Sequence, residues 1–171
     1  RAMRTELEVS AVSIHAYPEI AENYALMNCG ASMGEGYGPM IVAKQGVSEE
    51  EAKSSPIAVP GLKTSAYLGI RLCWGDLQYE VVPFGEIIPR ILDDTYKSGL
   101  IIHEGQLTYV DHDLNVLANL GIWWNEKTGG LPMPLGGNVV RRDLGQKMME
   151  DITMYTKMSI EHSIANPDTA L

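Results

Sequence analysis

His103 is the first residue of this sequence whose type and position could support chemistry. The apolar residues Leu100, Ile101 and Ile102 run directly into it, a pattern typical of a buried strand that delivers its last side chains to an edge. In open α/β sheets, ligands bind outside the carboxyl ends of the strands. Imidazole exchanges protons near neutral pH, so His103 is a candidate for function, although a histidine there can also be an ordinary edge residue.

Thr64 and Ser65 form a second candidate site. They follow a Pro60-Gly61 turn and precede a helical pattern over residues 66–74, so either can cap that helix. Backbone N–H groups at a helix start lie at the positive end of the helix dipole and bind anions readily. The alternative is an ordinary capped helix without a ligand, and the local sequence leaves both interpretations open.

Strands and helices that alternate along the chain must position these candidates. The expected strands are 57–59, 78–82 and 100–104, and the expected helices between them are 66–74 and 84–96. This order implies an α/β fold with a parallel sheet and right-handed crossovers, so Thr64, Ser65 and His103 are expected to face one crevice. The other expected elements are strands at 7–13, 40–43, 115–121 and 138–140, helices at 18–24 and 122–130, and a long helix from an Asp143 cap to about Ala165.

Other residues with chemical potential are interpreted as structural. His112 lies between Asp111 and Asp113, but three consecutive side chains point in different directions and rarely bind one ion, so no metal site is predicted. No Gly-x-Ser-x-Gly nucleophile elbow occurs in the sequence. Trp123 and Trp124 could belong to the core or to a cleft wall, and the core is the preferred interpretation.

The composition restricts the expected partners. The chain has 171 residues, 45% of them hydrophobic, and a formal net charge of -9. Nucleic acids and anionic membranes need a basic surface, so neither is expected as the main partner, whereas a small anionic ligand is compatible. Two widely spaced cysteines, Cys29 and Cys73, indicate reduced thiols and a cytoplasmic location. No apolar run reaches the roughly 18 residues needed to span a membrane.

Several spaced motifs resemble one known family over nearly the whole chain. They are Ser10–Tyr17, Gly34–Pro39, Val59–Tyr67, Leu100–Tyr109, Asn119–Trp124, Thr128–Gly136 and Arg141–Gly145. Together and in this order they resemble the 1,4-dihydroxy-6-naphthoate synthases, the lyases of the futalosine route to menaquinone. The combination is specific, whereas any one of the motifs alone would be weak evidence.

The resemblance implies a fold like the periplasmic binding proteins of type II, with two α/β lobes joined by two crossover strands and a ligand cleft between them. The expected domains are a partial first lobe at 1–37, a second lobe at 38–140, and a return segment and helix of the first lobe at 141–171. Full members of the family carry further residues at both ends. We therefore expect this chain to be a fragment whose first lobe is incomplete, and the first residues, which resemble neither a start nor a signal peptide, agree.

The resemblance also implies the conversion of cyclic dehypoxanthinylfutalosine to 1,4-dihydroxy-6-naphthoate without a metal or cofactor. His103 matches the family's general base in the interlobe cleft, Thr64 and Ser65 match substrate-binding positions, and Ser13 matches a position that lines the cleft. No role is assigned to Glu104. The alternatives are the chorismate dehydratase of the same family and a non-catalytic solute-binding protein for small anions. The oligomeric state is not predicted.

Overall fold

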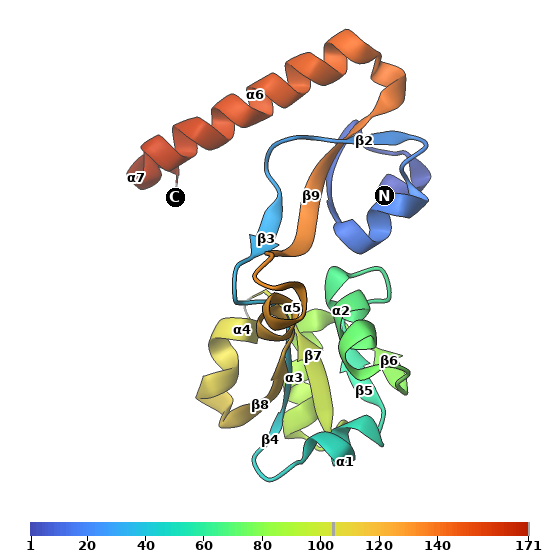
Figure 1. Ribbon diagram of the computed structural model, residues 1–171, viewed down its shortest axis with the longest axis vertical. Helices are drawn as coiled ribbons and strands as arrows, with labels where there is room; N and C mark the ends of the chain where they lie inside the picture. The colour runs from blue at the N-terminus through green and yellow to red at the C-terminus, as the bar shows by residue number, and fades with distance from the viewer. Residues whose placement is uncertain (104, 171) are drawn as a thin grey trace. The chain divides into compact units, whose positions relative to one another are not determined.

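The computed structural model describes residues 1–103 and 105–170 and contains two compact units (Figure 1). Unit 1 consists of Arg1–Ser32 and Gly136–Leu171, and unit 2 consists of Met33–Leu135. β3 (Ser32–Gly34) lies at the first boundary in sequence. The division expected from the sequence, with boundaries after residues 37 and 140, stays a prediction about the domains of the whole protein.

A five-stranded mixed sheet forms the centre of unit 2 (Figure 1). Its strands in spatial order are β6 (Tyr79–Val81), β5 (Ile57–Val59), β7 (Ser98–Ile101), β4 (Met40–Lys44) and β8 (Leu114–Asn119). β5 runs parallel to β6 and β7, which confirms the parallel arrangement predicted for this part of the chain. β4 pairs antiparallel with β7 and β8, so the strand predicted at 40–43 lies inside this sheet.

Helices pack on both faces of this sheet. α2 (Ser65–Trp74) and α5 (Leu120–Thr128) share a core with Ile57 and Val59, whereas α3 (Phe84–Leu92) shares a second core with Ala58. Neighbouring residues of β5 belong to different cores because successive side chains of a strand point to opposite faces of the sheet. The remaining helices of unit 2 are α1 (Glu49–Lys53), α4 (Gly105–Thr108) and the 3-10 helix Tyr109–His112.

The predicted helix at 66–74 is confirmed, and Thr64 is its N-cap. The predicted helix at 84–96 is too long, because the structure ends α3 at Leu92. Asp94 follows that end with a φ of 65°, a left-handed conformation that terminates helices. The strand predicted at 100–104 is shifted, since β7 ends at Ile101. His103 therefore lies just beyond the strand rather than inside it.

A small antiparallel sheet forms the centre of unit 1. β9 (Met133–Arg141) pairs with β1 (Val9–Ser13) and β2 (Tyr24–Leu26). The helix predicted at 18–24 is wrong, because Ile14–Glu19 form a 3-10 helix and Tyr24 enters β2. The ring of Tyr24 is fully buried, and its hydroxyl donates a hydrogen bond of 2.6 Å to the Leu7 carbonyl. This tertiary packing overrides the local helical pattern.

The long helix predicted near the end of the chain is confirmed as α6 (Gln146–Ala165). Its N-cap is Gly145 and not the predicted Asp143, whose carboxylate instead accepts a hydrogen bond of 2.7 Å from Arg141 Nε. No residue of α6 is buried. The remaining helices of unit 1 are the 3-10 helices Ala2–Arg4 and Arg142–Leu144 and the short α7 (Pro167–Ala170). Within the described ranges, no helix is long and apolar enough to cross a membrane.

Candidate active site

The carboxyl ends of β5 and β7 form the edge of the unit 2 sheet that carries three of the predicted site residues. The two strands are parallel neighbours, with Ala58 opposite Gly99. Thr64 and Ser65 follow β5, and His103 follows β7. Because parallel strands end at the same edge, these residues follow the strands along one edge of the sheet. The common crevice expected for them stays a prediction. Ser13 belongs to unit 1, where it ends β1 opposite Gly136.

His103 is exposed and adopts a φ of 54°. Non-glycine residues occupy this left-handed region rarely, at a cost of roughly 1–3 kcal/mol. Among the described residues, the other non-glycine residues with positive φ are Thr5, Asp94 and Asp113, which follow the ends of helices. His103 instead follows a strand, so helix termination does not account for its conformation.

A turn fixes the backbone after His103. The Gln106 amide nitrogen donates to the His103 carbonyl at 3.0 Å, and the Gln106 side chain donates to the Gly38 carbonyl at 3.0 Å. The next carbonyl, that of Pro39, accepts a hydrogen bond of 2.9 Å from the Leu120 amide. The turn is thus attached to the segment that leads into β4. Glu104, which follows His103, lies outside the described residues.

The Thr64 side chain caps α2. Its hydroxyl accepts a hydrogen bond of 3.0 Å from the Tyr67 amide and donates one of 2.8 Å to the Gly61 carbonyl. The Ser65 hydroxyl donates to the Leu135 carbonyl at 2.6 Å, and Ser65 is 7% exposed. Both hydroxyls therefore have a structural role, and the first turn of α2 offers a ligand chiefly the positive end of its helix dipole.

Phe84 is a neighbour of His103 that was not among the residues predicted from the sequence. It is the first residue of α3, and its ring lies edge-on to the imidazole, with centroids 5.9 Å apart and planes at 67°. Its position two residues after the expected strand at 78–82 is a signal that could have identified it. No comparable signal marks Gln106, because its partner Gly38 is far away in sequence.

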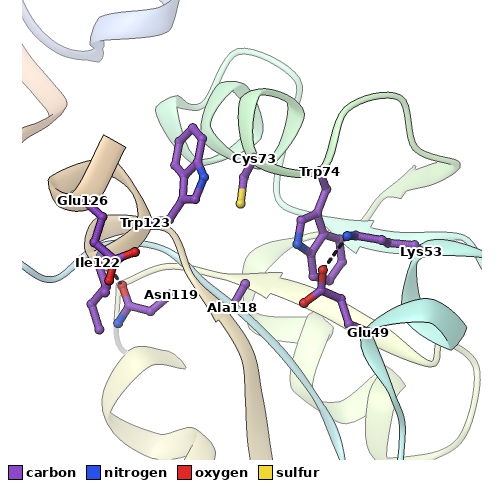
Figure 2. A pocket seen from close by; sticks show the side chains of 9 residues that line it. All are labelled: Glu49, Lys53, Cys73, Trp74, Ala118, Asn119, Ile122, Trp123 and Glu126. Carbon is purple, nitrogen blue, oxygen red and sulfur yellow. Dashed lines mark hydrogen bonds and ion pairs between the residues drawn. The ribbon is translucent and has the colours of Figure 1, made fainter. Parts of the chain in front are cut away.

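A pocket of about 440 Å³ lies elsewhere in unit 2. Figure 2 shows that side chains from α1, α2, β8 and α5 surround it; they are Glu49, Lys53, Cys73, Trp74, Ala118, Asn119, Ile122, Trp123 and Glu126. The Lys53 ammonium forms an ion pair with Glu49 and lies 4.9 Å from the centre of the Trp74 ring system. None of the predicted site residues lines this pocket.

The structure separates Trp123 from Trp124 and shows the surroundings of Cys73. Trp123 lines the pocket, whereas Trp124 packs on the core and donates to the Pro132 carbonyl at 3.2 Å. Burial raises the pKa of the Cys73 thiol, and Glu49 raises it further. A protonated thiol is a poor nucleophile, so Cys73 is not a candidate for catalysis. In the described part of the chain, no cluster of three His, Cys, Asp or Glu residues could hold a metal ion.

Comparison with known families adds the decisive observation. A family model described as menaquinone biosynthesis matches residues 1–171. The chain belongs to this family. It is 33% identical over 170 residues to a 1,4-dihydroxy-6-naphthoate synthase of Thermus thermophilus. It is 33% identical over 175 residues to the enzyme with the same name from Streptomyces coelicolor. In both comparisons the alignment covers 99% of this chain but 61% of the relative.

Solved structures with a similar fold are also found. Protein AF1704 from Archaeoglobus fulgidus is 42% identical, with a TM-score of 0.92 over 99% of this chain and 62% of its own. The ligand-binding component of an ABC-type import system from Staphylococcus aureus is 13% identical with a TM-score of 0.60, over 82% of this chain and 50% of its own. ArgBP from T. maritima is 11% identical with a TM-score of 0.61, over 98% and 68%. These distant neighbours confirm the fold predicted from the resemblance, that of the periplasmic binding proteins.

Proposed function

We propose that the whole protein is a 1,4-dihydroxy-6-naphthoate synthase, the lyase that converts cyclic dehypoxanthinylfutalosine to the naphthoate. The observation that carries the proposal is the match along 99% of the chain to two curated relatives with this name. The chain spans 61% of the length of these relatives. The activity is therefore proposed for the whole protein.

His103 acts as the general base in this proposal. A neutral imidazole takes a proton from the substrate near pH 7, after which ring opening and aromatisation drive the loss of the sugar-derived part. Support comes from its position at the carboxyl edge of the sheet and from its left-handed φ of 54°. Such strained residues persist only where the surrounding structure holds them, and they cluster at functional sites.

The remaining roles follow from charge. The start of α2, at Thr64 and Ser65, attracts the substrate carboxylate through the positive end of the helix dipole. Ser13 is a proposed substrate-binding residue because it matches the motif of the family. The reaction needs no metal or cofactor, and the protein acts in the cytoplasm on a small anionic substrate. The net charge of -9 on this chain disfavours nucleic acid and anionic membranes as partners.

The test is to incubate the full-length protein with cyclic dehypoxanthinylfutalosine and to detect the naphthoate. His103→Asn is the sharpest variant, because asparagine tolerates a positive φ and cannot act as a base of comparable strength. We expect turnover to fall by at least about 100-fold while substrate affinity changes only a few-fold. His112→Asn, an exposed histidine on a 3-10 helix, is the matched control and should keep wild-type turnover.

If His103→Asn keeps turnover within a few-fold of wild type, His103 is not the general base. Dehydration of chorismate by the wild-type protein would replace the proposal with the sister enzyme. Binding of a small anion without any turnover would instead indicate a solute-binding protein.

A further inference from the structure

Phe84 is the only phenylalanine in the chain, and its side chain is 57% exposed. On the same helix, Ile87, Ile88 and Ile91 are buried in the core. Single exposed apolar residues are common on protein surfaces, so exposure alone carries no functional meaning. The place of Phe84 on the sheet edge decides its interpretation.

Phe84 lies where β6 ends, at the edge that also carries the candidate site. The Val82 amide donates to the Val59 carbonyl at 2.9 Å, so the ends of β6 and β5 stay side by side. Along this edge the chain places Phe84 after β6, the start of α2 after β5, and His103 after β7. Phe84 and His103 are in contact, with ring centroids 5.9 Å apart and planes at 67°.

An edge-to-face pair leaves aromatic surface free. The edge of one ring meets a face of the other, so further faces stay open for a planar group. Both Phe84 and His103 are exposed, and solvent therefore reaches this surface. A phenyl ring adds no charge, so it selects a ligand by flatness and apolar area rather than by ionic attraction.

We propose that Phe84 contacts the substrate and determines specificity by stacking on a planar aromatic ring beside His103. The inference rests on the proposed function, because the product named for the relatives is a naphthoate, a flat bicyclic acid. Its ring stacks on Phe84, and its carboxylate points toward the positive start of α2. Phe84 therefore favours flat aromatic acids over saturated acids of equal charge.

The test measures binding of 1,4-dihydroxy-6-naphthoate to the full-length protein by calorimetry. Phe84→Leu keeps apolar volume but removes the aromatic face, and we expect a Kd about five- to tenfold higher. Phe84→Tyr keeps the ring and should bind within about twofold of wild type. Leu92→Ala, at the other end of α3 and 37% exposed, is the control and should not change the Kd. Cyclohexanecarboxylate should bind weakly and equally to wild type and Phe84→Leu.

An unchanged naphthoate Kd in Phe84→Leu overturns the inference. If that variant also has a lower kcat and a shifted pH profile, Phe84 only positions the His103 ring, and the proposed function survives. If the wild-type protein neither binds the naphthoate nor forms it, the proposed function fails and the inference fails with it. Thermal unfolding shows whether each variant keeps its fold. If Phe84→Leu does not fold, Phe84→Tyr carries the test, because its Kd for the naphthoate should stay within about twofold of wild type.

Discussion

Gly121→Ala should destabilise unit 2 and disturb the candidate site through a single methyl group. Gly121 is the second residue of α5 and is buried. A Cβ there would overlap the carbonyl group of Tyr37 and lie 2.5 Å from the Gly38 amide nitrogen. The approach is also too close from the other side, since a Cβ on Gly38 would lie 2.8 Å from the Gly121 amide nitrogen. Both partners are backbone, so no side-chain rotation relieves the overlap.

The magnitude follows from two opposing effects. Overpacking a filled site costs typically about 1–3 kcal/mol, and a backbone partner places this substitution near the upper end. The higher helix propensity of alanine offsets up to about 1 kcal/mol of this loss. The net loss is about 2 kcal/mol, which corresponds to a Tm lower by roughly 4–8 °C for a chain of this size.

Gly85→Ala is the matched control. Gly85 is also the second residue of its helix, α3, but a Cβ there meets nothing within 4 Å. Alanine should therefore keep or slightly raise the Tm. Thermal unfolding followed by circular dichroism compares the two variants. A Tm of Gly121→Ala equal to or above that of Gly85→Ala would refute the reasoning from backbone overlap.

The overlap should also reduce turnover. The carbonyl of Gly38 accepts the hydrogen bond from the Gln106 side chain that attaches the turn after His103. Movement of Gly38 away from Gly121 therefore loosens that turn. We expect the Gly121→Ala variant to lose turnover at temperatures well below its Tm, whereas Gly85→Ala retains it.

Two further predictions concern other hydrogen bonds of unit 2. Thr64→Ala removes the hydrogen bond from the Tyr67 amide and the one to the Gly61 carbonyl. The free energy of unfolding, measured in urea, should fall by about 1 kcal/mol. Equal stability of Thr64→Ala and Thr64→Ser would contradict this. The Tyr96 hydroxyl donates a hydrogen bond of 2.6 Å to the Glu80 carboxylate, and this bond raises the pKa of Tyr96. Its contribution to the free energy of unfolding is therefore complete below the ordinary tyrosine pKa of about 10 and is lost as the pH rises further. Tyr96→Phe should lower the unfolding free energy at pH 7 and weaken its alkaline dependence, and an unchanged alkaline slope would count against this hydrogen bond.

The local pattern of the sequence determined the elements of unit 2 that depend on near neighbours. The apolar run at 57–59 predicted β5, and the helical spacing of apolar residues at 66–74 predicted α2. Both signals depend only on residues that are close together in the sequence. Thr64 was identified as a possible cap because its hydroxyl acts within one helical turn. The alternation of strands and helices then placed Thr64, Ser65 and His103 at one sheet edge.

Only the tertiary structure decided the contacts between distant residues. Tyr24 joins a strand because β9 and the Leu7 carbonyl are its partners, and Asp143 loses the cap position while it pairs with Arg141. The same holds for the edge contact of Phe84 with His103. Local pattern specifies which face of an element is apolar, but it does not specify which distant residue packs against that face. For this reason the sequence identified the histidine, and the fold identified its aromatic neighbour.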